Sequence, residues 1–533
     1  MREVRDTAHM KPEKAASLFD GAFPLSLKNI LLRRKIMVRK STRFLSLLTA
    51  VLLLGTACST NNPETGDPVT PDSPAPAEEA EAVPAEEEIP PEEEERVAGP
   101  EAADLGGYAF RILTSVWYDN NKIIAPEELT GEVINDAVYN ANLNTMSTYN
   151  CVFSPIVLND YPSVTSAMTS AVKAGMDEYD MSLNHDNQTV SSALSGNHLN
   201  IRSSDVFNFD APWWTRTADD FTVGGGLYFA ANYTTYSPMY FGFALVYNKT
   251  IAEDNGLEIP YDKIIVGEWY LDDLIALTKD MNRDLDGDGV MEVGVDQYGF
   301  MASTLGLVNF QVSLGNFLLG KDEEGYLMLN IDEERLAKTL DAVERLMENG
   351  INKDVDGQWG YGTKYFAQGQ VLFNYPQILD IPAQMHDTDI RYGTIPPPKL
   401  DETQKDYVSG SFDIYWAIPK TAHQNLDTIA TIIEGMAHNC FYDVLPAAYE
   451  TTLQVRFSDS PNDARAYEII RDSMCVDIGY AFNEKVTGLN VLVRALSNMT
   501  SGNMSSTIAK NQKTITKMLD KINKSFREMN GGE

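Results

Sequence analysis

The chain has 533 residues, a formal net charge of −35 at pH 7 and a hydrophobic content of 43%. A single hydrophobic core stops growing at roughly 250 to 300 residues, so this length indicates at least two domains. Most of the acidic excess lies in residues 107–533. Such a body repels phosphate backbones and anionic lipid headgroups, which argues against nucleic acid as a partner and against electrostatic docking on a membrane.

The N-terminal region has the pattern of an export signal. A basic segment at 39–43 is followed by the apolar run 44–54 and then by small residues. The apolar run is too short to span a bilayer, which is typical of a secretory signal peptide, here residues 37–57. Because signal peptides begin close to their basic segment, we expect Met37 to be the true start and residues 1–36 to be an upstream extension.

Cys58 stands directly after the small residues Gly55, Thr56 and Ala57. This arrangement resembles the lipobox of bacterial lipoproteins, although Gly55 occupies the place where that pattern favours Leu. The resemblance implies that Cys58 carries a lipid and that the protein is anchored on the extracytoplasmic face of the cell membrane, which it contacts only through that lipid. An ordinary signal peptide with an incidental cysteine is the alternative.

Residues 58–106 are rich in Pro, Glu and Ala and offer little to bury, so we expect a disordered acidic tether. As a random coil it would span roughly 40 Å. The chain has four cysteines, and assigning Cys58 to the lipid leaves an odd number. A disulfide framework is therefore not expected in the body.

From residue 107 onward the pattern changes to that of an α/β protein. Residues 107–114 alternate like a strand, 135–149 have helical spacing, and 151–157 suggest a second strand, an order that favours a parallel sheet. Later segments continue the alternation: a strand at 241–247, a helix at 271–281 and a long amphipathic helix at 331–349.

An ordered set of short stretches in this body resembles a known family. The stretches are Leu245–Lys249, Gly256–Pro260, Trp269–Leu274, Asp284–Phe300, Tyr365–Phe373 and Tyr392–Lys399. In this order they resemble the family 1 extracellular solute-binding proteins, the relatives of maltose-binding protein. The resemblance covers most of residues 107–480.

The resemblance implies a two-lobed α/β fold of the periplasmic-binding-protein (Venus flytrap) type. By analogy, crossing segments lie near 245–248 and 394–398. Lobe 1 would comprise residues 107–245 and 399–450, and lobe 2 residues 246–398 and 451–533. The implied function is capture of a small solute by lobe closure, with delivery to an ABC permease in the membrane. We expect a carbohydrate as the solute, a monomeric protein, and no required cofactor.

Candidate ligand-binding residues are aromatic or polar and follow strands or precede a crossing segment. A sugar ring stacks its C–H face on Trp or Tyr while its hydroxyls seek polar partners, and open α/β sheets bind ligands at the carboxyl ends of their strands. The candidates are Trp117, Tyr118, Asn184, His185, Tyr236, Tyr240, Tyr375 and Trp416. For each of them, core packing or plain surface exposure is the alternative. Of the adjacent pair Trp213 and Trp214, at least one is expected to be structural.

The segment 284–289 begins like a calcium-binding loop, with Asp284, Asp286 and Asp288 as its carboxylates and glycine at its sixth position. Val295 stands where the loop would need its last carboxylate, and Asp296 comes one residue later. The sequence of this loop is compatible with a structural Ca²⁺ site and also with a turn that binds no metal.

The common catalytic signatures are absent from the sequence: it has no nucleophile elbow, zinc-protease helix, P-loop or dinucleotide-binding motif. We therefore expect a binding protein and not an enzyme. A binding protein for a peptide or another polar solute is one alternative. A cell-surface glycoside hydrolase is the other, because its two carboxylates carry no spacing signature.

Overall fold

The computed structural model describes residues 96–352, 361–385, 388–412, 414–452, 461–497 and 504–531. The predicted upstream extension, the signal peptide, Cys58 and most of the tether lie outside the described residues. Among the described helices, none is both long and apolar enough to cross a membrane.

The first large sheet has four strands in the order β12-β3-β1-β2. They are β1 (Tyr108–Ser115), β2 (Cys151–Leu158), β3 (Met181–His185) and β12 (Ile414–Ala417). β1 pairs in parallel with both β2 and β3, whereas β12 joins β3 in antiparallel fashion from far along the chain. The parallel pair predicted from the strand, helix, strand pattern is therefore present.

The second large sheet has five strands in the order β10-β4-β9-β5-β8. They are β4 (Leu245–Asn248), β5 (Tyr298–Ala302), β8 (Gly350–Asn352), β9 (Val371–Tyr375) and β10 (Tyr392–Ile395). β5 is parallel to β8 and β9, and β4 is antiparallel to β9 and β10. Two small sheets complete the strands: β6 (Leu319–Lys321) with β7 (Leu327–Leu329), and β11 (Ser409–Ser411) with β13 (Met474–Val476).

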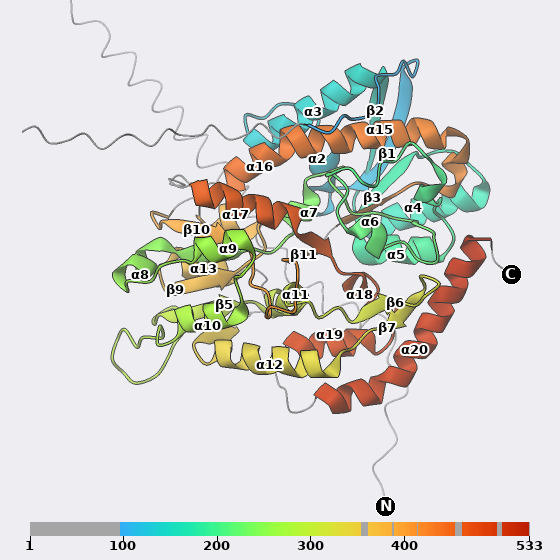
Figure 1. The fold of residues 1–533 in the computed structure, drawn as a ribbon. Coiled ribbons are helices and arrows are strands. Elements are labelled where there is room, and N and C mark those ends of the chain that lie inside the picture. Colours follow the sequence, from blue (N-terminus) through green and yellow to red (C-terminus); the bar gives the residue numbers. More distant parts are fainter. Residues whose placement is uncertain are drawn as a thin grey trace, which may run out of the picture. The chain divides into compact units, whose positions relative to one another are not determined.

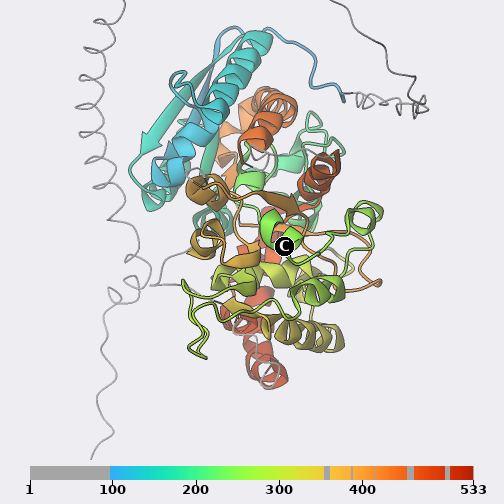
Figure 2. The ribbon, with the colours of Figure 1, turned by 90° about the vertical axis from the view of Figure 1, so that its left-hand side faces the viewer.

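Helices surround each large sheet, as Figures 1 and 2 show from two sides. Packed around the first sheet are α2 (Asn120–Ile124), α3 (Val133–Tyr149), α4 (Tyr161–Ala174), α5 (Asp186–Leu194) and α15 (Leu426–Asn439). Associated with the second are α8 (Lys249–Asp254), α9 (Tyr261–Val266), α10 (Leu271–Thr278), α11 (Thr304–Ser313), α12 (Glu333–Met347), α13 (Tyr361–Ala367), α14 (Asp380–Met385) and α17 (Pro461–Asp472). The remaining helices are α6 (Thr217–Asp220), α7 (Ser237–Tyr240), α16 (Leu445–Thr452), α18 (Ile478–Ala481), α19 (Leu489–Ser497) and α20 (Met504–Met529).

Helix α4 illustrates how local sequence sets these elements. The Asp160 side chain accepts a hydrogen bond from the Ser163 backbone N–H, Pro162 stands in the first turn, and Gly175 ends the helix in a left-handed conformation. Its buried face carries Val164 and Met168, which pack with Leu113 of β1. The helix therefore covers the face of the sheet toward which Leu113 points.

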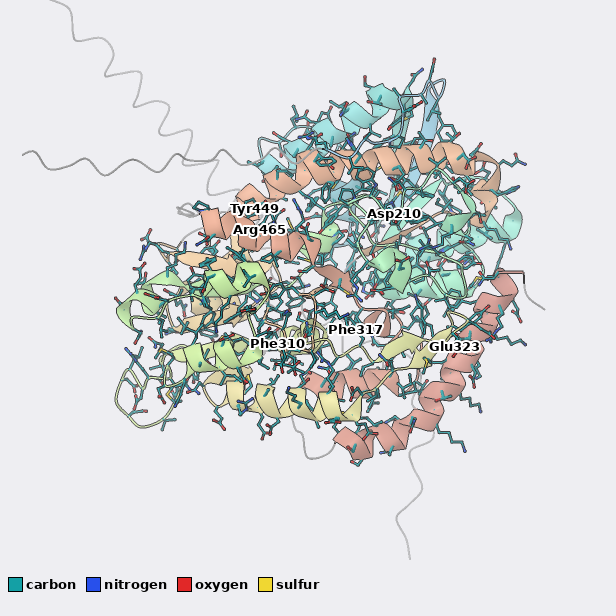
Figure 3. The ribbon with its side chains drawn as sticks, in the orientation of Figure 1. Asp210, Phe310, Phe317, Glu323, Tyr449 and Arg465 are labelled. Carbon is teal, nitrogen blue, oxygen red and sulfur yellow. The ribbon has the colours of Figure 1, made fainter. Side chains whose placement is uncertain are left out.

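The described residues form two large hydrophobic cores, and the first of them packs against strands of both large sheets. The first core includes Phe110, Ile112 and Leu183 and extends to the C-terminal helices through residues such as Phe526. The second contains Phe300, Phe310 and Tyr375, with ring centroids 5.0 to 5.9 Å apart along the chain of contacts. Phe310, labelled in Figure 3, projects from α11 into this core.

The segment predicted as a strand at 241–247 is only partly regular, because β4 begins at Leu245. The preceding residues bond to distant parts of the chain: the Phe243 N–H donates to Gly410 O at 2.9 Å, and the Ala244 N–H donates to Pro376 O at 3.4 Å. The chain therefore enters the second sheet alongside the segment that later returns to β12.

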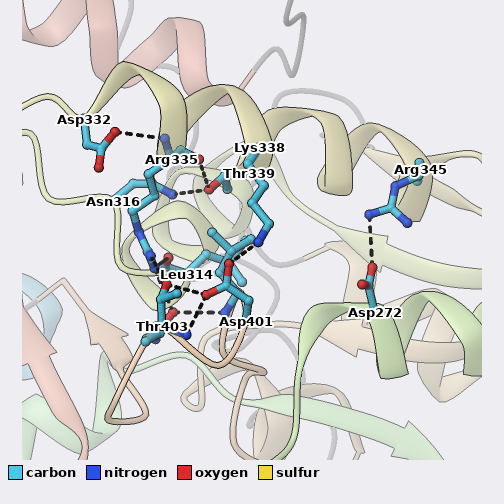
Figure 4. A network of polar contacts seen from close by, with 12 residues as sticks. Asp272, Leu314, Asn316, Asp332, Arg335, Lys338, Thr339, Arg345, Asp401 and Thr403 are labelled. Atoms are coloured by element: carbon cyan, nitrogen blue, oxygen red, sulfur yellow. Dashed lines mark hydrogen bonds and ion pairs between the residues drawn. The ribbon is translucent and has the colours of Figure 1, made fainter.

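A network of hydrogen bonds and an ion pair links residues 401–404, which precede β11, to α12 (Figure 4). The Arg335 guanidinium donates to Leu314 O at 2.7 Å and to Gln404 Oε1 at 3.2 Å. Lys338 forms an ion pair with Asp401. The Asp401 carboxylate also accepts the Thr403 backbone N–H at 2.9 Å, so the loop after β10 is held in a fixed shape.

Residues 96–106, which composition assigns to the tether, contact the elements around the first sheet. The Val97 N–H donates to the Tyr442 hydroxyl at 2.9 Å, and the Tyr149 hydroxyl donates to Pro100 O at 3.0 Å. The Leu105 N–H donates to Tyr149 O at 3.0 Å. Hydrogen bonds of the backbone hold residues 96–106 in place. Composition predicts disorder for them because it counts apolar side chains and not backbone hydrogen bonds.

Candidate functional site

The carboxyl edge of the first sheet is where the candidate residues gather. β1 and β3 are parallel, so both chains leave the sheet at the same edge. After β1 comes the short turn η3 (Trp117–Asp119), and after β3 comes α5, which starts at Asp186. This edge is the usual ligand position in open α/β sheets.

An aromatic cluster lies at this edge and consists of Trp117, Tyr118, Tyr161 and His185. The Trp117 ring centroid is 3.8 Å from that of Tyr118 and 4.7 Å from those of Tyr161 and His185. The Tyr161 and His185 centroids are 5.0 Å apart. Tyr118 is 49% exposed, so the cluster offers an aromatic surface to a ligand.

The aromatic cluster reaches residues that adjoin the second sheet. Tyr118 lies 5.8 Å, centroid to centroid, from Phe241, which in turn is 5.4 Å from Tyr240. The Tyr240 carbonyl accepts the Leu379 N–H at 3.0 Å, which places Asp380 beside these rings. Asp380, which follows β9 of the second sheet along the chain, thus lies close to the aromatic cluster at the edge of the first sheet.

The carboxylates of Asp186 and Asp380 make the surroundings of Tyr118 electrostatically negative. Partial burial raises the pKa of Tyr118, and the negative charges of Asp186 and Asp380 raise it further. Burial raises the pKa of Asp380 to about 6. Asp186 lies 2.5 Å from His185 Nδ1. No lysine, arginine or histidine among the described residues forms an ion pair with Asp380.

A small pocket adjoins Asp380 at the carboxyl ends of β5 and β9. It is lined by Phe243, Ser303, Leu305, Gly362, Thr363, Asn374, Tyr375, Pro376, Gln377 and Asp380. Its interior has room for roughly one water molecule. A sugar ring does not fit there unless the surrounding elements move apart.

The predicted site residues divide into two groups. The structure brings Trp117, Tyr118 and His185 together in the aromatic cluster. Tyr236 and Tyr240 contact each other at 5.4 Å, and Tyr240 continues the path to Phe241. The rule that ligand-binding residues follow parallel strands correctly places Trp117, Tyr118 and His185 at one edge of the sheet.

The other three candidates lie in the protein interior with partners of their own. Asn184 Nδ2 donates to Tyr161 O at 3.2 Å and to Thr165 Oγ1 at 3.1 Å. The Tyr375 hydroxyl donates to Asn309 Oδ1 at 2.8 Å, and Trp416 Nε1 donates to Asn232 Oδ1 at 2.9 Å. These side chains are 3%, 0% and 1% exposed, so their first role is packing.

Sequence reasoning missed Tyr161, Phe241 and Asp380 as members of this site. Tyr161 begins α4 and follows β2, so the strand-end rule that selected Trp117 could have found it. Phe241 and Asp380 carry no comparable local signal. Both lie more than a hundred residues from Tyr118 in the sequence, and only the folded chain brings them close to it.

In the acidic loop the structure brings together Asp284, Asp286 and Asp296, whose carboxylate oxygens lie within 4.8 Å of one another. Asp288 is not a member of this group and instead accepts the Val290 N–H at 2.7 Å. Asp296 is fully buried, and its oxygens accept the N–H groups of Leu285 at 2.8 Å and Glu292 at 2.6 Å. Oxygen donors of this kind suit Ca²⁺.

Trp213 and Trp214 are both buried and share one partner. Each indole N–H donates to the Glu434 carboxylate at 2.6 Å. Burial raises the pKa of Glu434 to about 7, and the two indoles oppose this rise. The expectation that at least one of the pair is structural is confirmed for both.

No protein-family model and no curated protein sequence matches this chain. Solved structures do match. A sugar transporter protein from Rhizobium etli in an open conformation is 13% identical, with 78% of this chain and 99% of that chain covered, at a TM-score of 0.52. The fold is that of two-lobed ABC solute-binding proteins. It confirms the two-lobed α/β architecture predicted from the sequence.

Two further structures have lower scores. An ABC substrate-binding protein from Listeria monocytogenes in complex with cycloalternan is 14% identical over 80% of this chain and all of that chain, at a TM-score of 0.46. UspC from M. tuberculosis is 15% identical over 77% of this chain and all of that chain, at 0.48. At these identities the likeness concerns the fold alone.

Proposed function

We propose that this protein is an extracytoplasmic solute-binding protein that captures a carbohydrate between its two lobes and delivers it to an ABC importer. The observation that carries the proposal is the aromatic cluster at the carboxyl edge of the first sheet, which lies beside Phe241 and close to Asp380 of the second lobe. Exposed aromatic faces stack on sugar rings, and carboxylates accept hydrogen bonds from sugar hydroxyls.

Lobe closure is the proposed mechanism. The pocket beside Asp380 has room for roughly one water molecule and is too small for a sugar ring, so the proposal places the sugar between the lobes, beside the aromatic cluster. A ligand that touches both lobes then favours the closed form by the difference in its affinity for the two states. The closed surface is what a permease would recognise. Anchoring of a monomer through a lipid on Cys58 belongs to the same proposal.

Ligand screening tests this function. We expect maltotriose, raffinose or another oligosaccharide to raise the melting temperature of the purified protein, with binding confirmed by calorimetry and no products on chromatography. Trp117→Ala should weaken binding because it removes the central ring of the aromatic cluster. Tyr179→Ala is the matched control, since Tyr179 precedes β3 at the opposite edge of the same sheet.

Two outcomes would contradict the proposal. Binding of amino acids or short peptides without any sugar would favour a binding protein for another polar solute. Release of shortened oligosaccharides would favour a glycoside hydrolase, in which paired carboxylates act as acid and base or nucleophile.

A further inference from the structure

Three consecutive glycines at 224–226 form a tight turn beside the first sheet, here called the glycine turn. The Val223 N–H closes it by donating to the carbonyl of the third glycine at 2.9 Å. The first two glycines have φ angles of 55° and 84°, in the left-handed region that favours glycine. A few residues later Ala230 forms a bridge with Trp416 of β12. The glycine turn is therefore attached to the first sheet.

The hairpin of β6 and β7 reaches the glycine turn from the second sheet. In the chain it lies between α11 and α12, which pack against β5 and β8. The Gly224 N–H donates to Gly325 O of the hairpin at 2.9 Å, and Lys321 Nζ donates to Asp219 O. A side chain at position 224 would collide with the Tyr326 ring. Glycine at this position therefore permits the close approach of the hairpin.

Helix α20 holds the hairpin from its other side. It packs against β7 and continues toward α5 beside the first sheet, as Figure 1 shows. The Asn523 side chain accepts the Leu327 N–H at 3.0 Å and donates to Leu327 O at 2.8 Å, as a neighbouring strand would. The Arg527 guanidinium lies 4.0 Å from the centre of the Tyr326 ring. The hairpin and α20 thus form one unit.

The C-terminal end of α20 also binds the glycine turn directly. Asn530, the residue after the helix, donates from Nδ2 to Val223 O at 3.1 Å and to Gly224 O at 2.9 Å. Its Oδ1 accepts the Tyr228 hydroxyl at 2.7 Å. Phe526, which is fully buried, lies 5.9 Å from the Tyr228 ring, centroid to centroid. Polar and apolar contacts therefore both fix α20 to this turn.

These contacts connect the two halves of the fold a second time, in addition to the crossing segments expected near 245–248 and 394–398. Five hydrogen bonds join residues 219–228 to the hairpin and to Asn530. A hydrogen bond is lost when its donor and acceptor move apart by much less than the width of a side chain. Movement of one sheet with its helices relative to the other must therefore break this set of bonds.

We propose that α20, Asn530 and the β6–β7 hairpin form a strap that holds the lobes together in the absence of a ligand. Separation of the lobes then requires the strap to leave the glycine turn, which lowers the population of the open form. This inference goes beyond the proposed function, because it concerns the ligand-free protein and applies whatever solute is bound.

Distance measurement between two spin labels tests the strap in the ligand-free protein. The labels are placed by Lys173→Cys in α4, beside the first sheet, and Ala276→Cys in α10, beside the second, and both positions are exposed. The cysteines among the described residues are buried, and Cys58→Ser is included in every protein so that the labels attach only at the two chosen positions. We expect one narrow range of separations in the protein with an intact strap.

Two variants release the strap from opposite sides. Asn530→Ala removes three of the hydrogen bonds. Gly226→Ala places a methyl against Asn530 and Tyr228, at a glycine whose φ is not positive. One hydrogen bond changes an equilibrium about fivefold, so each variant should raise the ratio of long to short separations at least about tenfold. Asn511→Ala is the matched control on α20, because Asn511 donates to Thr507 O within the helix, and it should change nothing.

Every outcome decides the matter. Long separations that already predominate in the protein with an intact strap would overturn the inference, and so would unchanged separations in folded Asn530→Ala and Gly226→Ala. If these two variants do not fold, Tyr228→Phe removes a single hydroxyl of the set and should raise the ratio about fivefold, and an unchanged ratio there would equally overturn the strap. No sugar is present, so failure of the sugar screen would contradict the proposed function and leave the strap standing.

Discussion

Glu434 is a buried carboxyl whose titration should change the stability of the protein. It is 1% exposed and accepts three hydrogen bonds, from the indoles of Trp213 and Trp214 at 2.6 Å and from the Asn208 N–H at 3.2 Å. Burial disfavours the charged form more than these donors favour it, so its pKa rises from 4.5 to about 7 on folding. We expect the Glu434→Gln variant to lose this titration.

The sign follows from proton linkage. Between pH 4.5 and about 7 the folded protein holds a proton on Glu434 that the unfolded chain has released. The free energy of unfolding therefore decreases as the pH rises through this window. The contribution is fully present below pH 4.5 and lost above about 7. One pKa unit corresponds to ~1.4 kcal/mol, so the shift amounts to about 3 kcal/mol.

Urea unfolding of the wild-type protein and Glu434→Gln at pH 4.5 and pH 8 measures this effect. Between these pH values the wild-type protein should lose about 3 kcal/mol more stability than the variant. Other groups titrate in both proteins and cancel in the difference, among them Asp477, with a pKa raised to about 6, and His198, with a pKa lowered to about 4. Parallel pH profiles of the two proteins would refute the reasoning.

Three other properties can be tested with single changes. Burial by itself would raise the pKa of Asp401, but the ion pair with Lys338 and the Thr403 hydrogen bonds lower it to about 2. Because Lys338 is largely exposed and solvent screens the pair, Asp401→Asn should remove about 1 kcal/mol of stability, which the wild-type protein loses only as the pH falls from about 4 to 2, as acid unfolding would show. Calcium at about 100 times its dissociation constant should stabilise the protein by ~2.7 kcal/mol, and Asp286→Asn should abolish the shift in melting temperature relative to chelator. Gly435→Ala places a methyl against the Tyr149 ring where α15 crosses α3, so urea unfolding should show a loss of ~1–3 kcal/mol despite the better helix propensity of alanine.

The sequence predicts local elements well where one face of each is buried. The alternation at 107–114 and the helical spacing at 135–149 correspond to β1 and α3. The prediction fails at 241–244, because there the backbone forms only isolated bridges, Gly242 with Ser411 and Phe243 with Gln377, and the regular strand begins at Leu245. An apolar run indicates burial, but it does not show whether the partner is a neighbouring strand.

The candidate site shows the same limit. The strand-end rule selects Trp117, Tyr118 and His185, since parallel strands finish at one edge whatever the rest of the fold does. Residue type alone cannot separate Trp117, which follows β1, from Trp416, which lies within β12. What distinguishes them is the acceptor Asn232 beneath Trp416, and only the packed structure supplies it.

Glu434 and Asp380 show why a raised pKa does not by itself identify a ligand site. Burial raises the pKa of both, but the Glu434 oxygens already accept three hydrogen bonds from their own chain and need no ligand as a partner. Asp380 lines a pocket, faces Tyr118 and Tyr240, and forms no ion pair within the described part of the chain. A hydroxyl donor from a bound sugar would lower the cost of its burial. Asp380 is therefore the carboxylate of the second lobe on which ligand-driven closure should depend.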